Sequence, residues 1–351
     1  MCQIFLDSTF CKTTNFLFTL LQPIFLMKTI FYCFLLFFII LFSCQEKKQE
    51  AITVNSTGKI NSLTVIMNDF LWNGEIGDSI RKKFASPVDG LPQEEPLFTI
   101  NQYPIKALDG NKTTNRNIII IKKEEKNFFE FKENEFASPQ NVIHISGNNA
   151  SEIIAHLQQN SDEIIRKIRQ TEITANQTNI QKNLLSDVTL KRKFKINLKI
   201  PATYNYALVR SNFVWLKKEI VSGSNSILVY SVPLKTILRD DNVVANIVKM
   251  RDSVQGMYVQ SKAKNAKMIT EKAYTPYFEP IILDKKRTYQ TKGTWELDGD
   301  YMSGCFINYA IIDRRKKRFV VIEGFCYAPS ADKRDLMFEL EAIIKSIKIL
   351  K

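Results

Sequence analysis

Four apolar segments that follow one another near the end of the chain constrain the fold more than any other feature. They lie at 278–283, 288–296, 305–312 and 319–327, each of strand length and separated from the next by polar or glycine residues. Successive strands with such short connections pair in the antiparallel direction. Apolar residues at helical spacing then run from Leu336 to Ile347, with Ser330 as the expected N-cap. This part of the chain is therefore predicted to be an antiparallel sheet closed by a helix.

The region before these strands continues the same alternation of strands and single helices. Apolar residues at every second position of 194–200 predict a half-exposed strand, which Pro201 ends. Strand structure is expected again at 206–219 and 227–232, and a helix over 243–257.

The first half of the folded chain combines short apolar strands with amphipathic helices. One helix is expected over 76–84, and two more are expected after Gly147. The capping-box sequence Asn160-Ser161-Asp162-Glu163 marks the boundary between those two, and the second runs into the 180s. The expected strands of this half are 63–67, 115–121, 128–131 and 141–146.

These groups of strands, each closed by single helices, predict an α+β fold with antiparallel sheets and helices packed on one face. We expect two sheet-and-helix subdomains, an N-terminal one over 61–190 and a C-terminal one over 191–351. The second resembles the small sandwich domains of the PsbP and Mog1 type, because it opens with a strand ending in proline and closes with strand, proline and helix. A fold does not by itself determine function.

An apolar segment over Met27–Cys44 indicates export. It has one cation near its start and a short apolar core, and polar and charged residues follow directly, which is the pattern of a secretory signal. The apolar core is shorter than a transmembrane helix usually needs. Its last residues, Leu41-Phe42-Ser43-Cys44, resemble a bacterial lipobox, in which the cysteine is acylated and becomes the mature N-terminus. We therefore expect a signal peptide over 27–43, lipidation at Cys44 and a flexible tether over 44–60.

Residues 1–26 hold a second apolar run, which is broken by Pro23. We interpret them as an over-extended start, with translation beginning at Met27, and a genuine long leader is the alternative. Gln45, rather than aspartate, follows the cysteine. By resemblance to known sorting rules this favours the outer membrane within the bacterial cell envelope.

The formal net charge of the chain is +13, and it remains strongly positive after residues 1–43 are removed. For an exported protein this favours anionic neighbours such as lipid head groups or lipopolysaccharide. Nucleic acid is not expected as a partner, because an exported chain rarely meets it. A surface that lysines simply keep soluble is the alternative explanation. The densest basic cluster is expected at an exposed hairpin tip, and it comprises Arg314, Arg315, Lys316, Lys317 and Arg318.

Several short blocks of sequence are distributed over most of the chain. They are Trp72 with Gly77–Arg81, Leu91–Pro96, Arg116–Ile118, Pro201 with Tyr204, Trp215, Arg251-Asp252, Gly293–Trp295, and Tyr327–Pro329 followed by Lys333-Arg334. Together these blocks resemble one uncharacterised family of envelope lipoproteins of Gram-negative bacteria, a domain of unknown function. The resemblance covers roughly residues 60–351, and it implies a compartment but supplies no catalytic residues. Where the family favours proline after the glycine at 304, this chain has Cys305.

Only two of the six cysteines, Cys305 and Cys326, follow Cys44 in the sequence, and the alternation of side chains along the strands predicts that they lie together. If the last two strands form a hairpin in which Asp313 lies opposite Arg318, then Cys305 lies opposite Cys326. Directly opposed residues in a non-hydrogen-bonded pair have Cα atoms about 4.5 Å apart, which a disulfide tolerates, and an oxidising envelope permits the bond. A hydrogen-bonded pairing or a two-residue slip would instead leave two thiols.

No motif of a known reaction stands out. His144 and His156 are expected to be structural or surface residues, since metal sites usually need three or four ligands, and we expect no metal and no cofactor. Arg116 is expected to pair with an acid such as Asp69 or Asp78 rather than to bind a ligand.

Two functions remain open at this point. A non-enzymatic envelope protein that binds another envelope protein, an anionic glycolipid or a lipid surface is favoured. The alternative is an unrecognised envelope hydrolase that uses loop carboxylates around Glu94 and Asp69.

Overall fold

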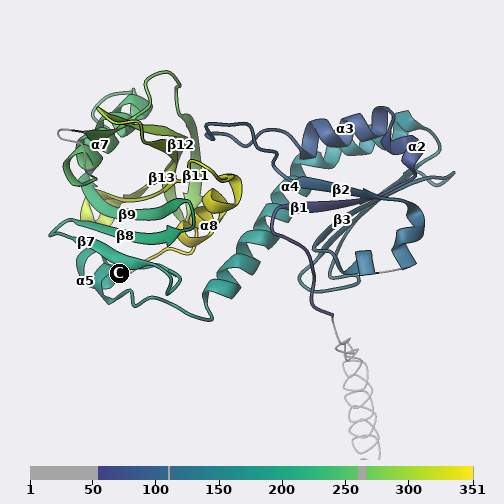
Figure 1. Cartoon of the computed structure of the whole chain (residues 1–351), viewed down its shortest axis with the longest axis horizontal. Coiled ribbons are helices and arrows are strands. Elements are labelled where there is room, and N and C mark those ends of the chain that lie inside the picture. The colour runs from purple at the N-terminus through teal and green to yellow at the C-terminus, as the bar shows by residue number, and fades with distance from the viewer. Residues whose placement is uncertain (1–53, 110, 260–265, 351) are drawn as a thin grey trace, which may run out of the picture. The chain divides into compact units, whose positions relative to one another are not determined.

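The structure is a computed structural model that describes residues 54–350 except 110 and 260–265. It has α+β architecture with two subdomains, each built on its own sheet, as the sequence predicts (Figure 1). Cys44, the predicted signal peptide and most of the predicted tether lie outside the described residues. Among the described residues, no helix combines the length and the apolar character that crossing a membrane requires.

The first subdomain contains a five-stranded sheet in the order β2-β1-β3-β5-β4. Only β4 is antiparallel to its neighbour, and the other pairs are parallel. The antiparallel pairing expected for this half is therefore wrong. The reason is that β1 and β2 are joined through a helix rather than a tight turn, and such a crossover returns the chain in the parallel direction. The strands are β1 (Ser62–Ile66), β2 (Thr99–Tyr103), β3 (Asn117–Lys123), β4 (Phe128–Glu133) and β5 (Asn141–Gly147).

The helices α3 (Glu75–Phe84) and α4 (Ala150–Ile180) cover one face of this sheet, and α2 (Asp69–Trp72) precedes them. The opposite face is covered by the short 3-10 segment η1 (Ile105–Asp109), which η2 (Asn111–Thr114) follows. Apolar side chains from α3, α4 and the strands form the core between helices and sheet; among them are Leu63, Ile76, Ile80, Ile119, Ile143, Leu157 and Ile168.

Helix α4 runs without a break through the segment for which two helices were expected. Ser161, in the expected capping box, is fully buried, and the Asn160 side chain donates to the backbone oxygen of His156 instead of capping a new helix. The true N-cap is Asn149, whose side chain accepts from the Glu152 backbone N–H. A stripe of buried isoleucine and leucine continues across the segment, so tertiary packing outweighs the local preference for a break.

The second subdomain contains a larger antiparallel sheet in the order β10-β12-β13-β14-β9-β8-β7, and β11 also pairs with β12. A short pair of strands, β6 (Ile196–Asn197) and β15 (Lys348–Ile349), lies beside it. The strands of the large sheet are β7 (Asn205–Val209), β8 (Phe213–Ile220), β9 (Gly223–Pro233), β10 (Lys267–Thr270), β11 (Tyr277–Leu283), β12 (Lys286–Asp298), β13 (Ser303–Asp313) and β14 (Arg318–Tyr327).

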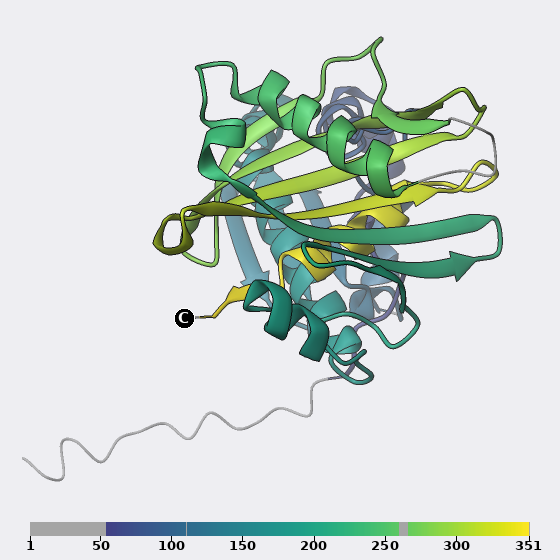
Figure 2. The same ribbon diagram turned by 90° about the vertical axis from the view of Figure 1, so that its left-hand side faces the viewer.

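Helices cover both faces of this second sheet, so the expectation of helices on one face is wrong here. Helix α7 (Val243–Tyr258) lies on one face, and α8 (Arg334–Ile344) lies on the other (Figure 2). The physical reason is that β13 and β14 are buried along nearly their whole length, so both of their faces need cover. The remaining short helices are α5 (Val188–Phe194), α6 (Leu234–Ile237) and the 3-10 turn η3 (Arg314–Lys316).

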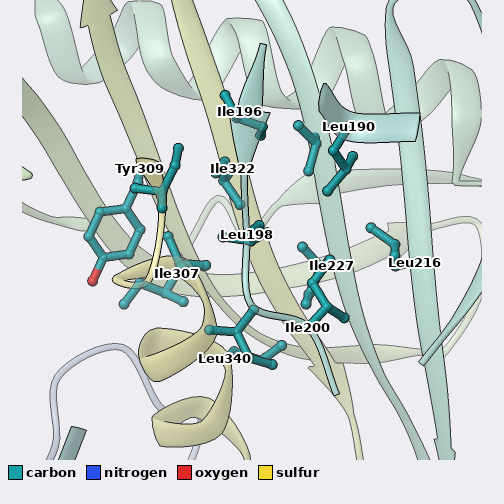
Figure 3. Close-up of a cluster of buried hydrophobic side chains, with 14 of the residues drawn as sticks. Leu190, Ile196, Leu198, Ile200, Leu216, Ile227, Ile307, Tyr309, Ile322 and Leu340 are labelled. Carbon is teal, nitrogen blue, oxygen red and sulfur yellow. The ribbon is translucent and has the colours of Figure 1, made fainter. Parts of the chain in front are cut away.

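The alternating segment 194–200 is only partly a strand. Phe194 ends α5, and only Ile196–Asn197 pairs with another strand. Its apolar side chains nevertheless point into the core on the α8 face, as the alternation predicts. Figure 3 shows Ile196, Leu198 and Ile200 packed there beside Ile322 and Leu340.

Helix α8 is capped by Glu95, a residue of the loop that precedes β2 and is distant in the sequence. The predicted N-cap, Ser330, does not fill this role, because the helix begins only at Arg334. Instead the carboxylate of Glu95 accepts from the backbone N–H groups of Lys333 at 2.7 Å and Arg334 at 2.8 Å. A carboxylate at a helix N-terminus satisfies unpaired donors and interacts favourably with the helix dipole.

We expect Glu95→Ala to lower the free energy of unfolding by about 1–2 kcal/mol, because two backbone donors lose a charged acceptor. Urea denaturation of residues 45–351 measures this. Glu94→Ala is the matched control, since Glu94 is the exposed neighbour of the same charge. Equal effects of the two substitutions would contradict the capping role.

Candidate functional site

The two cysteines lie opposite each other, and the predicted register of the hairpin is confirmed. Cys305 of β13 pairs with Cys326 of β14, and Asp313 pairs with Arg318 at the other end of the hairpin. Both cysteines are fully buried thiols whose Sγ atoms are 3.2 Å apart. Burial raises the pKa of the Cys305 thiol, and the hydrogen bond with Cys326 raises it further. The same hydrogen bond lowers the pKa of the Cys326 thiol. The two opposed Sγ atoms are placed for oxidation to a disulfide, and the disulfide itself stays a prediction.

The predicted basic cluster forms the tip of the same hairpin. Turn η3 and Lys317, whose φ is 50°, reverse the chain, and the four residues from Arg314 to Lys317 are exposed. None of these four side chains forms an ion pair with a described residue. Arg318 has a different role, because it pairs with Asp313 at 3.2 Å and donates to the backbone oxygen of Phe194. The cluster thus supplies four available cations and one structural arginine.

Other segments bring further cations to this tip. The Arg318 contact ties the hairpin to the end of α5, and Lys195, the C-cap of α5, accepts at its backbone oxygen from Leu350. Strand β15 in turn contacts the β11–β12 turn, since Asp284 pairs with Lys348 at 3.3 Å. We call the resulting surface the basic end; it comprises Lys195, Lys285, Lys286, Arg287, Arg314, Arg315, Lys316, Lys317 and Lys348.

The charge of the basic end is only partly balanced by the protein. Its described acids, Asp313 and Asp284, are each engaged by a cation or by backbone N–H groups. Although Lys316 is exposed, slight desolvation by the surrounding protein lowers the pKa of its ammonium group. The nearby Arg318, Lys195 and Arg315 lower this pKa further, which indicates crowded positive charge. An anion bound here would relieve this repulsion.

The carboxylates considered for hydrolysis do not converge. Glu94 precedes Thr99, which pairs with Ser62 at the beginning of β1, whereas Asp69 follows the end of β1. The length of the strand therefore separates them. Asp69 accepts from the Gln102 side chain at 2.8 Å, so it has a structural partner.

The histidines and Arg116 each have local partners. His144 contacts the Glu135 carboxylate at 2.6 Å, and the ring of His156 contacts the Asn127 side chain. Arg116 does pair with an acid, as expected, but the acid is Glu172 of α4, at 2.7 Å, rather than either of the predicted partners. Glu172 is almost fully buried, so this pair anchors α4 at the amino edge of β3.

A buried ion pair was missed by the sequence reasoning. Arg251 of α7 and Glu323 of β14 are both fully buried and 2.7 Å apart, and Gln255 and Asn308 also donate to the Glu323 carboxylate. The Arg251 guanidinium also stacks on the ring of Phe306. The sequence does contain a sign of this ion pair: Glu323 is a charged residue within a strand segment that is otherwise apolar. Since Arg251 of α7 and Glu323 of β14 are hydrogen-bonded to each other and to neighbouring side chains, this network positions α7 on the sheet.

Two family models match the chain, and both are described as a domain of unknown function. DUF8532 matches residues 56–181, and DUF4837 matches residues 182–346. The chain therefore consists, over 56–346, of two domains of unknown function. They take the place of the single family that the sequence blocks resemble, and neither description mentions a lipoprotein. No curated protein has a sequence that matches the chain.

Solved structures similar to part of the chain include PsbP and Mog1 proteins. Cyanobacterial PsbP from Synechocystis sp. PCC 6803 is 11% identical, and the match covers 44% of this chain and 86% of that one with a TM-score of 0.30. The Ran-binding protein Mog1p of Saccharomyces cerevisiae is 12% identical, and the match covers 44% of this chain and 90% of that one with a TM-score of 0.29. At these TM-scores the likeness carries no argument about function.

We expect the thiols of Cys305 and Cys326 to be oxidised in protein isolated from an oxidising compartment. Thiol counting on denatured, unreduced protein should then find none of the two reactive, and reduction should restore both. The bond would close a loop of about 20 residues and stabilise the fold by on the order of 3 kcal/mol. Two reactive thiols before reduction would show that the pair remains a packed part of the core.

Proposed function

We propose that this protein is a lipid-anchored, non-enzymatic binding protein of the bacterial cell envelope, and that its basic end holds an anionic surface. The observation that carries the proposal is the convergence of cations from separate segments around the tip of the β13–β14 hairpin. The lipobox-like sequence that ends at Cys44 supports the lipid anchor and the envelope location.

Electrostatic attraction of this kind is strong enough to matter at a membrane. Each Lys or Arg close to an anionic membrane contributes about 1 kcal/mol, and the attraction falls off within a Debye length of about 10 Å at 0.1 M salt. A lipid anchor and a basic patch add their contributions, and together they hold a protein more firmly than one signal alone. Ile282 is 72% exposed and pairs with Arg287, so an apolar side chain also lies within this surface.

The shape of the hairpin tip suits contact with head groups rather than a reaction. Its cations are on a turn that projects from the end of two long strands, and no described carboxylate, histidine or thiol with an available reactive atom lies among them. The proposed partner is a phosphate-bearing lipid surface, and an anionic glycolipid such as lipopolysaccharide presents the same chemistry.

The lipid anchor is tested by fatty-acid labelling of cells that make the full chain or its Cys44→Ser variant. We expect the label and the membrane association of the full chain to be lost in the variant. Labelling that persists after Cys44→Ser would place any lipid elsewhere.

The basic end is tested by vesicle binding of residues 45–351, since residues 53–351 form one compact unit. We expect binding to vesicles that contain phosphatidylglycerol, little binding to phosphatidylcholine alone, and loss of binding at high salt. The test variant replaces Arg314, Arg315 and Lys316 by Ser and Lys317 by Asn, because Asn tolerates the positive φ at that position. We expect roughly a tenfold or greater loss of affinity, which is about 1.4 kcal/mol or more.

A charge-matched control separates this surface from net charge. Its four substitutions to Ser are all at exposed lysines of the first subdomain or its boundary, namely Lys59, Lys82, Lys106 and Lys182. We expect it to bind like the unchanged protein. If the two quadruple variants bind equally, the basic end is only a solvated turn. Lipopolysaccharide that competes while phosphatidylglycerol does not would make a glycolipid the partner.

A further inference from the structure

The first subdomain has a crevice at the edge where its parallel strands end. The chain leaves β1 towards the face covered by α3, and it leaves β2 towards the opposite face, which η1 covers. In open parallel sheets, ligands bind outside the carboxyl ends of the strands at the point where successive connections diverge to opposite faces. This crevice occupies that position and lies in a different subdomain from the basic end.

The crevice is of the size that small ligands occupy. Its cavity volume is about 560 Å³, which is within the range of small-molecule sites. Apolar side chains from three consecutive parts of the sheet edge line it: Leu71 after β1, Ile105 after β2, and Ile121 near the end of β3. Phe70 is also part of the lining and is 84% exposed, so an aromatic ring is available to a ligand.

The loop that carries Phe70 is held in place before any ligand arrives. The Asn68 side chain accepts from the Phe70 backbone N–H at 2.8 Å. The Gln102 side chain donates both to the Met67 backbone oxygen and to Asp69, which ties the loop to β2. Binding to such a fixed loop loses little conformational entropy.

The charged side chains of the crevice indicate what kind of ligand it suits. Lys122 and Lys123 line the crevice, are exposed, and form no ion pair with a described residue. Glu124 is the single acid among the described residues of the lining, so the lining itself carries a net positive charge. A purely apolar ligand would leave the lysines unused, and a divalent cation would find too few oxygen ligands.

We propose that this crevice binds a small ring-bearing anion, that is, a ligand with an aromatic or other planar apolar ring and a carboxylate, sulfonate or phosphate group. The ring stacks on Phe70 above the floor formed by Leu71, Ile105 and Ile121. The anionic group pairs with one of the two lysines at the end of β3, Lys122 or Lys123, whose side chains leave the strand on opposite faces. The site does not depend on the lipid anchor or on the basic end.

The test uses 1-anilinonaphthalene-8-sulfonate, which carries both chemical features and fluoresces when its rings leave water. We expect residues 45–351 to bind it saturably at one site. Phe70→Ala should weaken binding roughly tenfold, about 1.4 kcal/mol, and Lys122→Ser with Lys123→Ser should weaken it by a similar factor. Because Phe70 and both lysines are exposed, the thermal midpoint of unfolding should change little in these variants.

Two controls make the outcome specific to the crevice. Tyr301→Ala removes a fully exposed aromatic ring elsewhere, and Arg314→Ser with Arg315→Ser removes two cations of the basic end. Both should bind the probe like the unchanged protein. Unchanged binding in the Phe70 and lysine variants overturns the proposal, as does an equal loss in the controls. Neither result bears on vesicle binding, so the two proposals fail independently.

Discussion

The pairing of β13 with β14 is the constraint on which most of the second subdomain depends. Its register runs from Cys305 opposite Cys326 to Asp313 opposite Arg318, and both strands are buried along nearly their whole length. Because side chains alternate between faces, this single register assigns every residue of the hairpin to one of two cores. A slip of one residue would exchange the apolar face for the face that carries Glu323, and would bury charge without its partner.

Each covering helix is matched to one face of that hairpin. On one face α8 lies so close that a Cβ added at Gly324 would be 2.8 Å from the Cβ of Leu340, so only glycine permits the approach. On the other face Arg251 places α7 through its ion pair with Glu323. A charged anchor of this kind is poor evidence for stability, but it specifies one position because any other leaves two buried charges unpaired.

The two subdomains present surfaces of different chemistry. The tip of the hairpin and the segments tied to it expose cations with few acids among them, which suits an extended anionic surface. The carboxyl edge of the first sheet combines an aromatic ring, an apolar floor and two lysines in a cavity, which suits a small molecule. Both follow from topology, since a hairpin ends in an exposed turn and a parallel sheet collects its loops at one edge.

The sequence alone determined the features that depend on local periodicity: most strands and helices, the α+β class, the face of each residue in the last hairpin and the exposed basic turn. Alternation fixes the face of each residue but is unchanged by a slip of two residues, so the folded hairpin decided the register in which Cys305 lies opposite Cys326. The tertiary structure decided strand direction, helix continuity and the contacts between distant segments, because none of these depends on local periodicity. Sheet direction in the first half followed from the crossover through α3, and the continuity of α4 followed from packing across Ser161. Three further features join residues that are distant in the chain, and only the folded backbone brings such residues close together. They are the capping of α8 by Glu95, the buried pair of Arg251 with Glu323, and the positions of Lys195, Lys285 and Lys348 around the hairpin tip.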